Sequence, residues 1–222
     1  MAKLKTKPPG IRAQRRARKR ARILAVARAL LRDHGHERLS LRHVARRAGM
    51  SPAGMYEYFD NRDHLIDALV AEANEALTAS LRAATHGVPD PLERLVGLGL
   101  AYIRFARERT RDFLLLYSRR SSRRSLAEDV PVGSEYEAII SAVRDVVSVG
   151  RPDGEVLPFL EALAYGFWSY IHGMAMLQLG HLAGFRADFA GAHRLLLEGM
   201  ARSWQRADWT KAAGSPAGRP PR

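Results

Sequence analysis

Cysteine is absent from the 222 residues of the chain. This absence excludes disulfides, a thiol nucleophile and any zinc site built on cysteine. No apolar run approaches the roughly 20 residues that cross a bilayer. The basic N-terminus is not followed by the apolar segment that a signal peptide requires, so we expect neither a membrane span nor export.

The motifs of common catalytic sites are also missing. There is no glycine-rich phosphate loop, no G-x-S-x-G elbow and no H-E-x-x-H pair, and we identify no paired carboxylates. His34 and His36 flank Gly35 at the predicted end of a helix, where a role in ending that helix is expected rather than a metal site. The sequence therefore predicts no enzyme, no cofactor and no metal, with a helical enzyme kept as an alternative.

What the chain does contain is a helical pattern. Its composition, 46% hydrophobic and 27% charged, is that of a globular protein. Apolar residues recur at helical spacing along most of the chain, and no strand pattern or internal repeat is present. We therefore predict an all-α fold.

Positive charge is concentrated at the N-terminus. Residues 1–60 hold 16 Lys and Arg against 4 Asp and Glu, whereas the other 162 residues hold 20 against 19. Such a segment attracts phosphates. An anionic membrane would attract it too, but Arg12 to Arg32 lacks the large aromatic or leucine face of interfacial helices. The charge therefore indicates a nucleic acid partner and no membrane.

Residues 40–62 predict two short helices joined by a tight turn. Ser40 is a good N-cap for the first helix, and Gly49 supplies the freedom that a helix end needs. Ser51 and Pro52 then restart the chain as cap and first helical residue. The inward positions fall at helical spacing: Leu41, Val44, Ala45 and Ala48 in the first helix, then Met55 and Phe59. This is a helix-turn-helix pattern, whose second helix fits the major groove.

The run from Ala48 to Ser51, with Met55-Tyr56, Tyr58-Phe59 and Asn61-Arg62, resembles the DNA-binding domain of TetR-type transcriptional regulators. The resemblance implies a ligand-responsive regulator of bacterial cytoplasm, associated with the nucleoid. Most such proteins are repressors that bind a pseudo-palindromic operator in double-stranded DNA as dimers and are released by a small effector. A helical hairpin without a nucleic acid partner and a nonspecific architectural DNA-binding protein remain alternatives.

By resemblance, the DNA contacts come from the second short helix and its flanks. Arg42 has the reach for a guanine edge, Arg62 is a candidate phosphate clamp, and Glu57 is expected to pair with a nearby arginine. The full set implied is Ser40, Arg42, Ser51, Pro52, Ala53, Gly54, Tyr56, Tyr58 and Arg62.

Four segments are expected: a flexible basic arm (1–11), a helix-turn-helix domain (12–60), a helical ligand-binding and dimerisation domain (61–206) and a disordered tail (207–222). Helix 155–179 is apolar nearly all round, which predicts burial on both sides. Helix 187–206 is predicted to be amphipathic through Phe189, Ala192, Leu196, Met200 and Trp204. The resemblance implies a homodimer whose four-helix bundle uses these last two helices.

Trp168 to Gly173 is similar to the Trp-x-x-x-His-Gly signature of one subgroup (WHG) of TetR-type ligand domains. His172 then either offers a polar group in a mainly apolar pocket or is a hydrogen-bonded histidine of the core or interface. The sequence leaves both readings open. The candidate pocket residues are Tyr102, Phe105, Phe113, Tyr117, Phe167, Trp168, His172 and Met176.

Overall fold

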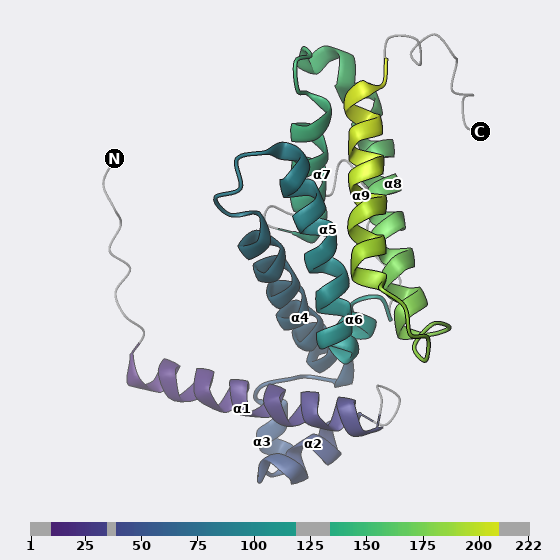
Figure 1. The fold of residues 1–222 in the computed structure, drawn as a ribbon. Helices are drawn as coiled ribbons and strands as arrows, with labels where there is room; N and C mark the ends of the chain where they lie inside the picture. Colours follow the sequence, from purple (N-terminus) through teal and green to yellow (C-terminus); the bar gives the residue numbers. More distant parts are fainter. Residues whose placement is uncertain (1–9, 35–38, 119–133, 209–222) are drawn as a thin grey trace, which may run out of the picture. The chain divides into compact units, whose positions relative to one another are not determined.

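The computed structural model describes residues 10–34, 39–118 and 134–208, with the side chains of 32–34 and 153–158 left aside. Within these ranges every regular element is a helix, so the predicted all-α fold is confirmed (Figure 1). The helices are α1 (Ile11–His34), α2 (Leu41–Ala48), α3 (Pro52–Tyr56), α4 (Arg62–Thr85), α5 (Pro91–Glu108), α6 (Thr110–Leu116), α7 (Glu135–Val147), α8 (Asp153–Leu179) and α9 (Phe189–Arg206).

The chain divides into two compact units, residues 1–73 and 74–222. The boundary predicted from the sequence lies before α4, whereas the division of the chain falls inside this helix, after Ala73. The first turns of α4 belong to the N-terminal unit because Leu65, Ile66 and Leu69 are buried there. Most of the predicted arm (1–11) and tail (207–222) lies outside the described residues.

The N-terminal unit is built on the second half of α1. Its inner stripe is buried, as predicted: Ile23, Leu24, Ala27, Leu30 and Leu31. By contrast, all side chains from Ile11 to Arg22 are exposed. Arg28 of α1 also pairs with Glu72 of α4, which fastens the two helices together.

The turn between α2 and α3 has the predicted geometry. Gly49 has φ 68° and ψ 39°, the left-handed conformation that lets the chain leave α2. The amide N–H of Met50 donates to the carbonyl of Ala45 at 2.9 Å, which closes the end of the helix. Met55 and Phe59 are buried behind the turn, with exposed fractions of 0% and 3%. Local chemistry therefore sets where α3 begins.

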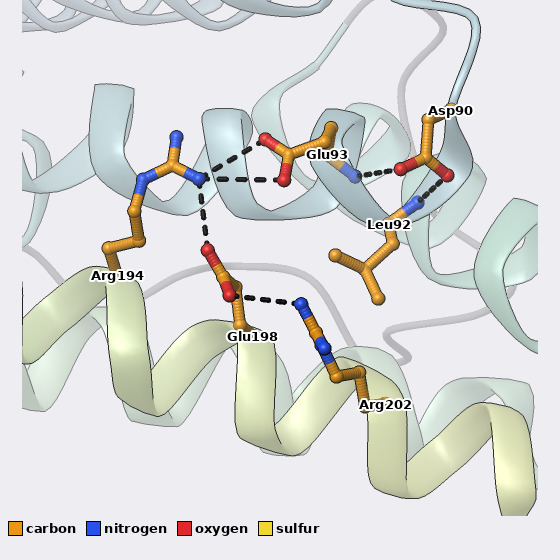
Figure 2. Close-up of polar contacts among 6 residues, drawn as sticks. All are labelled: Asp90, Leu92, Glu93, Arg194, Glu198 and Arg202. Atoms are coloured by element: carbon orange, nitrogen blue, oxygen red, sulfur yellow. Dashed lines mark hydrogen bonds and ion pairs between the residues drawn. The ribbon is translucent and has the colours of Figure 1, made fainter.

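In the C-terminal unit, α5 is the central helix and packs against α6, α7, α8 and α9. The carboxylate of Asp90 accepts the N–H groups of Leu92 and Glu93, which caps α5 (Figure 2). At the same end, Arg194 of α9 donates to Glu93 of α5 and to Glu198 of its own helix. These exposed ion pairs connect α9 to α5 but add little stability.

The inner face of α9 agrees with the prediction only in part, since Met200 and Trp204 pack against the core but other predicted residues do not. Its buried residues are His193, Leu197 and Ala201, whereas Leu196 is 47% exposed and Ala192 is exposed too. The reason is that α9 carries apolar residues on two faces, and α5 selects one. Gly99 of α5 makes room for that face, since a Cβ there would lie 2.9 Å from Cδ1 of Leu197.

One face of α8 packs into the core through Leu160, Ala164, Phe167 and Ile171. Its apolar residues continue beyond this face, but Tyr165, Met176 and Leu177 are exposed in the single chain. The predicted burial on both sides is therefore not seen within one chain. Among the described residues, no helix combines the length and hydropathy needed to cross a bilayer.

Gly49→Ala tests the strain at the turn. No atom lies within 4 Å of a Cβ built there, so the cost comes from the left-handed backbone alone. We expect a loss of about 1–2 kcal/mol in the free energy of unfolding, measured by urea titration with circular dichroism. Gly49→Asn is the control and should lose clearly less, because asparagine tolerates this conformation. Equal losses would mean that the turn has another requirement.

Candidate functional site

Two serines are the N-caps of α2 and α3, the two helices of the helix-turn-helix. Oγ of Ser40 accepts the N–H of His43 at 3.2 Å, and Oγ of Ser51 accepts the N–H of Gly54 at 3.1 Å. Each hydroxyl uses a lone pair for its cap and keeps its own proton, which can be donated to an acceptor outside the protein. Both serines are exposed, so capping and phosphate binding are compatible.

The outer surface of α3 is small and open. Pro52 and Ala53 are exposed, and Tyr56 is 54% exposed. Gly54 lies against its own cap, since a Cβ there would be 3.2 Å from Oγ of Ser51. Arg42 is exposed on α2. The outer face of α3 is therefore small and accessible, as entry of a helix into the major groove requires.

Arg62 has a structural role that the sequence pattern does not reveal. Its Nε donates to the carbonyl oxygen of Leu39 at 2.9 Å, which ties the start of α4 to the residue just before the cap of α2. The side chain is half-buried. Replacing Arg62 would therefore disturb the helix-turn-helix itself as well as any phosphate contact.

Arg16 of α1 is not among the contacts predicted from the sequence. Its Nη2 donates to the backbone carbonyl of Glu57 at 3.0 Å, and its guanidinium lies 5.9 Å from the centre of the Tyr58 ring. Tyr58 is consequently half-buried rather than projecting freely. The carboxylate of Glu57 forms no ion pair with a described residue, contrary to expectation, because the arginine beside it binds the main chain. The sequence signal that could have identified Arg16 is the helical spacing of the basic residues in α1.

A second group of candidate residues meets in the C-terminal unit around the hydroxyl of Tyr102. This oxygen lies 2.7 Å from the hydroxyl of Tyr117, 2.9 Å from Nδ1 of His172 and 3.3 Å from Nε1 of Trp168. A tyrosine hydroxyl has one proton and two lone pairs, so three partners saturate it. Trp168 can only donate, and the Tyr102 proton therefore goes to Tyr117 or His172.

Burial sets the protonation states of this cluster. It raises the pKa of Tyr102 far above its ordinary value, an effect reinforced by Tyr117. Burial also raises the pKa of Tyr117 to about 12, and it lowers the pKa of His172. The cluster is thus neutral near pH 7, with hydroxyl and imidazole groups in place of charges.

Beside this cluster, two buried polar atoms have no hydrogen-bond partner among the described residues. Oε2 of Glu135 and the hydroxyl of Tyr136 make no hydrogen bond within the described part of the chain. The carboxylate of Glu135 contributes to the raised pKa of both Tyr102 and Tyr117, and the ring of Tyr136 lies 5.6 Å from that of Trp168. Neither residue is among those predicted from the sequence. A buried polar atom without a partner is costly unless something satisfies it.

Only some of the predicted pocket residues are in contact with one another. Tyr102, Phe113, Tyr117, Trp168 and His172 are linked by ring contacts or hydrogen bonds. Phe105 and Phe167 are buried elsewhere in the same hydrophobic core. Met176 is 41% exposed on α8, one turn beyond His172.

Comparisons with known proteins match both units. The family described as "Bacterial regulatory proteins, tetR family" matches residues 23–69. The family described as "Tetracyclin repressor-like, C-terminal domain" matches residues 95–201. These families are regulators rather than enzymes. Their two matches cover the helix-turn-helix and the domain that contains the aromatic cluster.

Two individual relatives are also transcriptional regulators. The HTH-type transcriptional regulator Mb1846 of Mycobacterium bovis is 36% identical over 75 residues, 34% of this chain and 32% of that protein. The HTH-type transcriptional repressor KstR2 of Mycobacterium tuberculosis is 29% identical over 83 residues, 37% of this chain and 42% of that protein. The chain thus spans less than half the length of these curated relatives.

A solved structure extends the likeness to most of the chain. The crystal structure of the regulatory protein SCO4313 is 26% identical, with a TM-score of 0.62, and the match covers 88% of this chain and 98% of that one. The helix-turn-helix geometry, the two family matches and this shared architecture lead to one conclusion. The chain belongs to the TetR family of transcriptional regulators.

Proposed function

We propose that the protein is a repressor that binds a pseudo-palindromic operator as a homodimer and is released by a small, mainly apolar effector. The observation that carries the proposal is the capped α2–α3 turn, which leaves a small face of α3 exposed and follows a helix on which Arg42 is exposed. Such a helix enters the major groove, where arginine is the commonest reader of guanine. The proposed contacts remain Ser40, Arg42, Ser51, Pro52, Ala53, Gly54, Tyr56, Tyr58 and Arg62.

The proposed dimer uses α8 and α9. On α9, Leu195 is 71% exposed beside Leu196, and α8 exposes Tyr165 and Leu177. Water around so many large apolar side chains is unfavourable, and such surfaces usually pair with a partner. A second copy would bury these faces in a four-helix bundle. Two copies of α3 about one DNA turn apart, ~34–36 Å, would then read the two halves of an operator.

The proposed effector site is the aromatic cluster around Tyr102. Its rings favour an apolar molecule, as does the similarity of Trp168 to Gly173 to the WHG signature. Oε2 of Glu135, which has no hydrogen-bond partner in the part of the chain that the structure describes, favours an effector that also carries a hydrogen-bond donor. Since α4 contributes residues to both compact units, a change near the cluster has a continuous helix through which to alter DNA affinity. The coupling is reciprocal, so operator DNA would weaken effector binding equally.

Arg42→Ala tests operator reading. We expect it to relax the preference at one base position in each half-site, at a cost of about 1–3 kcal/mol. Binding to a panel of operator variants by gel shift measures this preference. Arg47→Ala, on the same helix, is the control and should weaken all sequences alike. A wild-type protein that binds every duplex equally would instead be a nonspecific architectural DNA-binding protein.

Leu195→Glu tests the dimer. We expect a monomer in sedimentation equilibrium and a loss of cooperative binding to the full operator, because a buried unpaired carboxylate opposes association. Leu114→Glu is the matched control, since Leu114 of α6 is also an exposed leucine, at 39%. A Leu195→Glu protein that stays dimeric would place the interface elsewhere.

Glu135→Gln tests the effector site. We expect native mass spectrometry to detect a small molecule on the wild-type protein. The variant should need roughly tenfold more of that molecule for release from DNA, since a charge-assisted hydrogen bond is worth about 1.5–3 kcal/mol. Glu137→Gln, two residues further along α7, is the control and should respond like wild type. Equal sensitivity of both variants would exclude Glu135 from the site.

A further inference from the structure

We propose that a cationic cleft between α1 and the residues that follow α3 binds the phosphate backbone of the DNA duplex. This inference rests on the proposed DNA binding but goes beyond the helix-turn-helix. The cleft measures about 590 Å³ and is lined by Arg12, Arg15, Arg16 and Lys19 of α1 with Glu57 and Tyr58. Its α1 residues fall at positions i, i+3, i+4 and i+7, which is one face of a helix.

The part of α1 that lines the cleft adds nothing to the hydrophobic core. Residues 11–22 contain seven arginines or lysines and no acidic residue, and all twelve side chains are exposed. The helix is buried only from Ile23 onward. Mutual repulsion makes such a cationic helix unfavourable by itself. An anionic partner along its length would remove that cost.

The cleft has a defined position because Arg16 fixes it. The bond from Arg16 to the carbonyl of Glu57 and the contact with the Tyr58 ring join α1 to the chain directly after α3. Arg20 adds a similar contact, with its guanidinium 5.4 Å from the centre of the Phe59 ring. The cations therefore lie beside the end of the helix proposed to read the bases.

The remaining charges of the cleft are available for a ligand. Arg12, Arg15 and Lys19 form no hydrogen bond or ion pair with any residue that the structure describes. Glu57 is the single carboxylate among the lining residues, so four cations face one anion. The hydroxyl of Tyr58 adds a neutral donor of the kind that binds phosphate oxygens.

Duplex DNA fits this cleft better than a free anion. The lining side chains of α1 are exposed, and salt at physiological strength screens isolated charges over about 8 Å. A single small anion would therefore bind weakly. Twelve helical residues span about 18 Å, and one DNA strand places a phosphate every ~3.4 Å, so the backbone offers several charges at once.

The test compares two double variants that each remove two positive charges from α1. Arg12→Gln with Arg15→Gln removes charges from the cleft, whereas Arg18→Gln with Arg22→Gln removes charges that do not line it. Glutamine keeps a similar helix propensity, and all four positions are exposed, so both proteins should fold. Circular dichroism and a melting curve on each purified protein verify this.

The readout is the salt dependence of binding to a duplex. For the cleft variant, the slope of log affinity against log salt should fall by roughly two units, about 0.9 for each lost phosphate contact. The control variant should change it by less than one unit. Phosphate ethylation interference gives a second readout, because interference at particular phosphates should disappear only in the cleft variant.

Equal reductions in both variants would overturn the proposal, since only the overall charge of α1 would matter. An unchanged slope in the cleft variant would overturn it as well. Failure of the proposed function looks different, because the wild-type protein would then show no preference among duplex sequences. The slope comparison is made on any duplex and stands independently of that result.

Discussion

The left-handed backbone at Gly49 is the constraint on which the DNA-binding part of this protein depends. It ends α2 and turns the chain so that Ser51 can cap α3 within two residues. The buried side chains of Met55 and Phe59 then hold α3 against the unit. The proposed contacts of α3 follow from this turn, because the turn sets the start of the helix at Pro52.

Charge and hydrophobicity are divided between the two units. The N-terminal unit concentrates cations on the first half of α1 and on α2, where they remain exposed. The C-terminal unit is nearly neutral and places apolar residues on both faces of α8 and α9. One unit is therefore suited to a polyanion and the other to apolar partners, which are a second copy of the chain and a small molecule in the function proposed above.

The aromatic cluster combines stability with an unsatisfied polar group. Three donors and acceptors saturate the hydroxyl of Tyr102, and burial keeps the tyrosines and His172 uncharged. Close by, Glu135 and Tyr136 each retain an atom without a partner among the described residues. A core that satisfied all its polar groups would have little to offer a ligand, so the contrast itself supports a binding role for this region.

The sequence by itself determined the features that depend on neighbours along the chain. The caps at Ser40 and Ser51, the turn at Gly49 and the helical fold all follow from local hydrogen bonds and helical spacing, and the resemblance to TetR-type proteins rests on the same residues. Only the tertiary structure decided which face of α9 is inside, because both faces carry apolar residues. The face with His193 and Leu197 is buried, since Gly99 of α5 leaves room for Leu197, and Leu196 stays exposed. The tertiary structure also decided that Arg62 binds the carbonyl of Leu39 and that Arg16 reaches Glu57. The two contacts span sequence separations of 23 and 41 residues. Helical spacing predicts contacts only between near neighbours along the chain, so it cannot predict these.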